Sequence, residues 1–208
     1  SIINDLSSGQ IMDRLLSGDV GFGKTEVAMN AIFATVKGGY QALLVVPTTL
    51  LSSQHYHTLY DRLHSYGIRI AKLDRFVTAK EKNATLKLLK SGDIDCIIGT
   101  HALFGIECAK LGLVVIDEEH KFGVKQKEKL KSLYENVHLL SMSATPIPRS
   151  LNQALSSIKS MSELLIPPSE RLGVRTFVKN YDETLIKEVV LRELRRGGQI
   201  DFTFKNRC

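Results

Sequence analysis

The chain has 208 residues, of which 43% are hydrophobic and 24% charged, a composition that excludes disordered and fibrous architectures. It has no apolar stretch long enough for a membrane span, no secretory signal pattern and no CxxC pair among Cys96, Cys108 and Cys208, so we expect a cytoplasmic protein without disulfides or zinc. The net charge of +6 permits a polyanionic partner but is also compatible with an ordinary solvated surface.

Apolar runs typical of strands buried on both faces alternate with helical patterns along most of the chain. Parallel strands need crossover connections, which are right-handed and usually helical. We therefore predict an α/β fold with a mainly parallel sheet and helices on both faces, and we expect ligands at the carboxyl ends of the strands. An apolar run at 11–16 precedes a glycine-rich loop; further strands are expected at 41–46, 94–98, 113–116 and 137–140, and helices at 24–36, 50–65, 78–90, 124–133 and 149–155.

The pattern changes after Pro167-Pro168, where a second segment is expected. Residues 173–178 read as a strand, 184–196 as an amphipathic helix that Gly197-Gly198 ends, and 199–204 as the beginning of another strand. We therefore divide the chain into a lobe at 1–166 and a segment at 167–208, which is too short for a second full domain.

The segment Gly18-Asp19-Val20-Gly21-Phe22-Gly23-Lys24-Thr25 matches the pattern GxxxxGK[ST] in full. Glycines let successive backbone N–H groups curl around a phosphate, and the positive end of the following helix dipole adds to the attraction. Lys24 would reach the β- and γ-phosphates of a nucleotide, and the Thr25 hydroxyl would hold Mg²⁺. The alternative is a glycine-rich turn with a purely structural use.

A carboxylate cluster, Asp117-Glu118-Glu119-His120, follows the apolar strand predicted at 113–116. A phosphate loop needs a carboxylate to hold its metal at the end of such a strand, so Asp117 is the candidate Mg²⁺ ligand and Glu118 the candidate general base for an attacking water. Adjacent carboxylates also repel one another unless a cation lies nearby. The alternative is a helix N-terminus at which acidic residues only favour the dipole.

A third polar segment, Ser143-Ala144-Thr145, follows the strand predicted at 137–140. Hydroxyl groups at this place could hydrogen-bond to the acidic cluster and sense the γ-phosphate. Taken alone, the segment is more typical of a plain helix cap, and His120 taken alone is compatible with a surface residue.

The three segments, in this order and at these intervals, resemble motifs I, II and III of the superfamily 2 helicases and translocases. Residues 46–56 are similar to motif Ia and residues 98–101 to motif Ib. The stretches 143–151 and 99–104 narrow the resemblance to two branches, the RecG-like enzymes and the translocases that couple transcription to DNA repair. Phe22 and Glu119 favour the second branch, because RecG-like enzymes usually have Ser and Gln there.

This resemblance implies a RecA-like P-loop NTPase lobe of an ATP-dependent translocase on double-stranded DNA, with ATP and Mg²⁺ as cofactors. The partners it implies are duplex DNA, RNA polymerase and excision-repair proteins, the last two through other parts of a parent protein. Lys24, Asp117 and Glu118 would be catalytic, and a second group, His120, Ser143, Ala144 and Thr145, would couple the nucleotide to DNA. Backbone phosphates would lie along Pro47, Thr48, Thr49, Arg75, Thr100, His101 and Arg149. The alternatives there are that Thr48 and Thr49 cap a helix and that Arg75 is a solvated charge.

The chain departs from the family pattern in three places. The upstream segment that reads adenine is absent, and Gln10 lies too close to the loop to replace it. The arginine-bearing motifs of a second lobe do not follow Gly198, and residues 200–208 match the start of that lobe poorly. Because an inserted arginine contributes about 10³ to 10⁵ in rate, we expect a piece of a longer protein that binds nucleotide weakly and hydrolyses little.

Three other functions remain open from the sequence. The first is RecG-like remodelling of replication forks, and the second is a nucleotide-dependent binding module without motor output. The third, a small-molecule P-loop kinase, is disfavoured because no acceptor lid is visible and Glu118 suits the activation of water.

Overall fold

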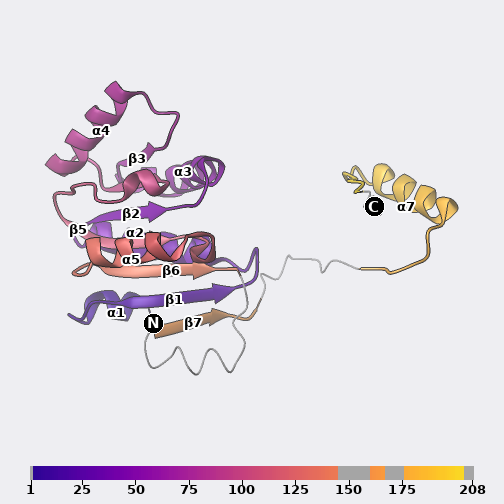
Figure 1. Cartoon of the computed structure of the whole chain (residues 1–208), viewed down its shortest axis with the longest axis horizontal. Coiled ribbons are helices and arrows are strands. Elements are labelled where there is room, and N and C mark those ends of the chain that lie inside the picture. Colours follow the sequence, from indigo (N-terminus) through magenta and orange to yellow (C-terminus); the bar gives the residue numbers. More distant parts are fainter. Residues whose placement is uncertain (1, 145–159, 167–175, 204–208) are drawn as a thin grey trace. The chain divides into compact units, whose positions relative to one another are not determined.

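A computed structural model describes residues 2–144, 160–166 and 176–203. The chain divides into two compact units, Ser1–Ser169 and Glu170–Cys208, of which the first contains the sheet (Figure 1). In these described ranges no helix is long and apolar enough to cross a membrane.

The first unit is built on a sheet of seven strands whose pairings are all parallel (Figure 1). The order across the sheet is β3-β4-β2-β5-β6-β1-β7, so the chain crosses repeatedly from strand to strand. The parallel α/β fold predicted from the alternating runs is therefore confirmed. The strands are β1 (Asp13–Gly18), β2 (Gln41–Val45), β3 (Ile70–Leu73), β4 (Cys96–Gly99), β5 (Leu111–Ile116), β6 (His138–Ser143) and β7 (Ser160–Leu164).

Helices cover both faces of the sheet because successive apolar side chains of the central strands point to opposite faces. Leu44 packs in one core with α1 (Ile2–Ser7), α2 (Lys24–Lys37) and α3 (Thr49–Leu63). Leu43 and Val45 point to the other core, which contains residues of α4 (Ala79–Ser91) and α5 (Val124–Leu133). Short 3-10 turns, η1 (His64–Tyr66), η2 (His101–Leu103) and η3 (Glu119–Lys121), follow α3, β4 and β5.

The expected strands and helices of the first unit are found within a few residues of their predicted bounds, but three elements were missed. α1, β3 and β7 are short, and β7 is a half-exposed strand at one end of the sheet order, so none produces a strong apolar run. The helix expected at 149–155 lies outside the described residues.

In the second unit the helix prediction is confirmed by α7 (Glu183–Arg195), whose N-cap Asp182 accepts hydrogen bonds from the backbone of Thr184 and Leu185. The two strand predictions beside it are wrong in their described parts, since residues 176–178 and 199–203 form no strand. Phe177 and Val178 are largely exposed, so their apolar character does not reflect burial in a sheet here. A strand needs a neighbour to take its backbone hydrogen bonds, and composition alone does not supply one.

Candidate functional site

The glycine-rich loop connects β1 to α2 at the carboxyl edge of the sheet. Lys24 begins α2, is 9% exposed, and its Nζ donates hydrogen bonds to the carbonyl oxygens of Gly18 at 2.6 Å and Asp19 at 3.0 Å. The ammonium group is therefore folded back over the loop, where it can meet an anion that the loop surrounds.

Two glycines of the loop have backbone angles that other residues rarely adopt. Gly21 has φ 78° and Gly23 has φ 88°, and Gly23 is the N-cap of α2. Gly18 is required for a different reason: a Cβ there would lie 3.0 Å from the Cβ of Leu164 on the neighbouring β7. The loop therefore needs glycine for both conformation and close packing, which agrees with the reason its pattern was singled out.

Asp117 follows β5 and is held in one orientation by two hydrogen bonds. Its Oδ2 lies 2.8 Å from Nε2 of His55 on α3, and its Oδ1 accepts from the backbone N–H of Glu118 at 2.9 Å. Asp117 and His55 are both buried, with 7% and 8% exposure. The carboxylate is thus fixed in place at the strand end.

Glu118 has φ 51° and ψ 50°, the only left-handed non-glycine residue among those the structure describes. Strained backbone of this kind is commonly concentrated at functional sites. Its Oε2 lies 3.4 Å from Nε2 of His120, and Glu119 lies 3.9 Å from Lys127 on α5. The three adjacent acids therefore point to different partners, which reduces their mutual repulsion.

One cleft of about 600 Å³ brings the loop and the acids together, and we call it the loop cleft. A carboxylate and a hydroxyl are hard oxygen ligands of the kind that Mg²⁺ takes at nucleotide sites, alongside phosphate oxygens. The donor set therefore fits a magnesium–nucleotide complex, with Thr25 and Asp117 able to hold the metal and Lys24 the phosphates. The lining residues are Val20, Gly21, Gly23, Lys24, Thr25, Leu51, Gln54, His55, Thr58, Asp117 and Glu118.

The Ser-Ala-Thr segment begins at the end of β6, between β1 and β5 in the sheet. Ser143 is buried and pairs in register with Ser17, directly before the glycine-rich loop. Ala144 is half-buried, and Thr145 lies outside the described residues. Ser143 therefore lies beside the strand end that leads into the loop, and its hydrogen bond to the acidic cluster stays a prediction.

A second hollow, of about 310 Å³, lies at the carboxyl ends of β2, β3 and β4, and we call it the edge hollow. Thr48 is the N-cap of α3, because its side chain accepts a hydrogen bond from the N–H of Leu51 at 3.2 Å. The alternative that Thr48 caps a helix is therefore confirmed. Arg75 is exposed and lies over the ring of Phe76, 4.9 Å from its centroid. Arg149 lies outside the described residues, and the hollow is lined by the other six candidates, Pro47, Thr48, Thr49, Arg75, Thr100 and His101.

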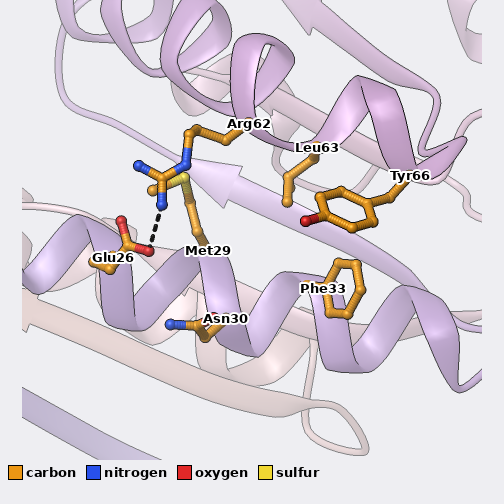
Figure 2. Close-up of a pocket in the computed structure, with 7 residues that line it drawn as sticks. All are labelled: Glu26, Met29, Asn30, Phe33, Arg62, Leu63 and Tyr66. Carbon is orange, nitrogen blue, oxygen red and sulfur yellow. Dashed lines mark hydrogen bonds and ion pairs between the residues drawn. The ribbon is translucent and has the colours of Figure 1, made fainter.

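A third hollow lies between α2 and the end of α3, and we call it the helix groove (Figure 2). Arg62 donates to Glu26 across it at 2.7 Å, and the rings of Phe33 and Tyr66 meet edge to face at 5.3 Å. Nothing in the sequence patterns pointed to this groove. Its lining is Glu26, Met29, Asn30, Phe33, Arg62, Leu63 and Tyr66.

The sequence also gave no separate role to His55, which was noted only as part of the segment similar to motif Ia. In the structure it is buried in the loop cleft and contacts Asp117. A single histidine inside an amphipathic helical segment carried no signal of its own, because its partner lies 62 positions away in the chain.

The parallel sheet, the glycine-rich loop and the acidic cluster at its carboxyl edge together define a P-loop NTPase lobe of the helicase type. Residues 1–154 match the DEAD/DEAH box helicase family, and the chain belongs to that family.

Individual relatives give a more specific comparison than the family match. The chain is 60% identical over 199 residues to the transcription-repair-coupling factor of Helicobacter pylori and 45% identical over 208 residues to that of Escherichia coli. These matches cover 96% and 99% of the chain but only 20% and 18% of the relatives. Among solved structures, RecG bound to a three-way DNA junction matches with a TM-score of 0.80 and 38% identity, over 95% of this chain and 27% of RecG. The RecA-like helicase fold expected from the motifs is confirmed.

Proposed function

We propose that this chain is the ATP-binding lobe of a translocase on double-stranded DNA that acts in transcription-coupled repair. The observation that carries the proposal is the convergence of Lys24, Thr25, Asp117 and Glu118 on one cleft at the carboxyl edge of the sheet. Relatives named transcription-repair-coupling factor are similar over nearly the whole chain, and they support the choice of process.

Each of these side chains has a role that follows from its position. A bound magnesium–ATP complex would supply the phosphoryl group that water attacks. Lys24 would neutralise the phosphates, Thr25 and Asp117 would hold the metal, and Glu118 would orient the water and accept its proton. Glu118 is the N-cap residue of η3 but makes no side-chain capping hydrogen bond there, and it lines the loop cleft.

The edge hollow is the proposed contact with DNA. Hydroxyl groups, an imidazole and a guanidinium suit phosphate oxygens, and contacts of this kind do not read the base sequence, which a moving motor requires. RNA polymerase and excision-repair proteins are the further partners proposed for a parent protein, and a cytoplasmic location remains a prediction. His120, Ser143, Ala144 and Thr145 are the proposed link between the cleft and DNA.

The test of the catalytic assignment is a Glu118→Gln variant in a protein that carries this lobe together with a second motor lobe. We expect DNA-stimulated ATP hydrolysis to fall about 10²- to 10⁴-fold, the usual share of a general base, while nucleotide affinity is retained. Hydrolysis at the normal rate would remove Glu118 from this role.

The test of the loop is the binding of a fluorescent ATP analogue to the chain itself. Lys24→Ala should abolish binding, whereas Lys37→Ala at the far end of the same helix should not change it. Equal affinity in both variants would contradict the proposed phosphate site. We also expect little hydrolysis by the isolated chain, because a second lobe normally inserts the arginine that stabilises the transition state.

A second candidate, fork remodelling, is favoured by the similarity to RecG on a three-way DNA junction. The two proposals differ in what the parent acts on. A parent that displaces a stalled RNA polymerase and leaves junctions intact supports the first proposal, and the converse result supports the second.

A further inference from the structure

Helix α3 contributes to the edge hollow, the loop cleft and the helix groove. Its N-cap Thr48 and first residue Thr49 line the edge hollow, its middle lines the loop cleft through His55, and its end lines the helix groove through Arg62. With a rise of 1.5 Å per residue, Thr48 and His55 are separated by roughly 10 Å along the helix. One rigid element thus joins the proposed DNA contact to the proposed metal site.

The contact of α3 with the acidic cluster is specific. His55 is 8% exposed and its Nε2 lies 2.8 Å from Oδ2 of Asp117, while the backbone of Glu118 occupies Oδ1. A buried carboxylate that loses one such partner keeps an unsatisfied oxygen and gains rotational freedom. The position of α3 therefore helps to set the orientation of Asp117, together with the backbone of Glu118.

Packing along the length of α3 makes the helix behave as one rigid unit. Leu59 and Leu63 are buried against the sheet, and Tyr60 stacks on Tyr56 and His64 along the outer surface of the same helix. Figure 2 shows Arg62 reaching from α3 toward Glu26, an ion pair in which both side chains are at least half exposed. Exposed pairs of this kind contribute little, so the buried leucines and His55 are the attachments that matter.

We propose that His55 is a positioning residue that holds Asp117 in the orientation needed to bind the metal. Through α3, His55 would also transmit the binding of a DNA backbone phosphate in the edge hollow to the loop cleft. The inference rests on the proposed function. Duplex DNA bound at the start of α3 would fix that helix, and the fixed helix would fix the carboxylate. Binding of DNA and of magnesium–nucleotide to the same chain would then be mutually strengthening.

The experiment measures this coupling by equilibrium binding, independently of turnover. The affinity of the chain for a magnesium complex of a non-hydrolysable ATP analogue is determined with and without a saturating 20-base-pair duplex. We expect duplex DNA to raise the affinity of the wild-type chain by a factor in the range of about 5 to 150, as is usual for coupled sites.

Three variants then separate the roles. His55→Ala should reduce the factor to within about twofold of unity while the affinity for DNA alone is unchanged. His55→Gln, which keeps a donor that can reach Asp117, should restore most of the factor. The matched control is Arg62→Ala, which changes the same helix without contacting Asp117 and should leave the factor as in wild type.

The outcomes are distinguishable. A wild-type chain that binds neither nucleotide nor DNA contradicts the proposed function itself. A chain that binds both without coupling, or with coupling that both His55 variants retain, contradicts only the role of His55. If His55→Ala does not fold, His55→Leu takes its place, because leucine fills the buried position without a hydrogen-bond donor for Asp117. Coupling that is lost in His55→Leu but kept in His55→Gln and Arg62→Ala supports the role, and coupling retained in His55→Leu overturns it.

Discussion

Glu118 combines a place in the loop cleft with an unfavourable backbone conformation. Its φ of 51° lies in the left-handed region, which costs roughly 1–2 kcal/mol for a residue with a Cβ. The preceding residue, Asp117, is fixed by the backbone of β2, since its N–H donates to the carbonyl of Val45 at 2.9 Å. The fold therefore imposes the turn that directs Glu118 into the loop cleft.

Because of this strain, we predict that glycine and alanine at position 118 have the reverse of their usual order of stability. At an ordinary position glycine is less stable than alanine by about 0.5–1 kcal/mol, because it loses more chain entropy on folding. At Glu118 we expect Glu118→Gly to be more stable than Glu118→Ala, since only glycine adopts this conformation without a Cβ penalty. Urea unfolding of both variants is the measurement, and alanine being the more stable would show that the turn carries no strain.

Gly99, the last residue of β4, is needed for close packing. A Cβ at this position would lie 2.2 Å from the backbone oxygen of Leu73 on β3 and 3.0 Å from Cγ of Leu103. The nearest atom belongs to the backbone, so the clash cannot be relieved by rotating a side chain. We expect Gly99→Ala to reduce the free energy of unfolding by about 1–3 kcal/mol, as overpacking usually does.

Gly123 provides the control for that substitution. It has φ −66°, and the nearest atom to an added Cβ is the side-chain Oε1 of Gln126 at 4.0 Å. Gly123→Ala meets no clash, but Gly123 is the N-cap of α5, where alanine is less favourable than glycine, so we expect a loss of at most about 1 kcal/mol. Similar losses in both variants would mean that the contact with Leu73 is relieved by a shift of β3.

At the scale of elements, β3 is an end strand of the sheet and pairs with a single neighbour, β4. Arg69, directly before β3, donates to both carboxylate oxygens of Asp95 directly before β4, at 2.8 and 3.0 Å. Burial raises the pKa of the Asp95 carboxyl, but the hydrogen bonds and charge of Arg69 outweigh it, so the pKa lies below its usual value. The pair therefore fastens the two strands at their amino ends.

A carboxyl whose pKa is lowered by folding stabilises the protein above its unfolded pKa, and this contribution is lost as the pH falls through the folded pKa. Arg69→Met should therefore destabilise the chain by about 0.2–1 kcal/mol at pH 7, a small value because half of the arginine is exposed. The difference from wild type should begin to shrink as the pH falls below the usual aspartate pKa of about 3.9, and it should vanish as the pH passes through the lower folded pKa of Asp95. Lys90→Met, which breaks the fully exposed pair with Glu107, is the control and should have no measurable effect at either pH. A constant difference across the pH range would contradict the role of Asp95.

The elements also show where sequence reasoning succeeds and fails. The central strands β2 and β5 were predictable because they are buried on both faces and read as continuous apolar runs. β3 and β7 were not, because end strands are short and partly exposed and their identity depends on a neighbour. The strand expected at 173–178 failed for the converse reason: an apolar run was present, but its described part has no strand partner.

At the scale of the whole molecule, the net charge of +6 and the edge hollow together predict how DNA binding depends on salt. If backbone phosphates bind there, the affinity for duplex DNA should fall steeply and log-linearly with salt and be indifferent to base sequence. Arg75→Gln should lower the salt slope by about one, whereas Arg192→Gln on α7 should not. Fluorescence anisotropy over a salt series measures both, and a slope near zero would exclude binding through phosphates.

The sequence by itself determined which residues are candidates for the chemistry of this protein. A glycine-rich loop and a run of acids are local patterns, and residue type and spacing indicate their proposed roles: glycine for conformation, lysine and threonine for phosphate and metal, carboxylates for metal and water. The tertiary structure decided what those residues meet. It brought His55 to Asp117, gathered six phosphate-contact candidates from three strand ends into one hollow, and bent the backbone at Glu118. The physical reason is that such contacts depend on the order of strands in the sheet, which joins residues far apart in the chain and leaves no periodic or local signature.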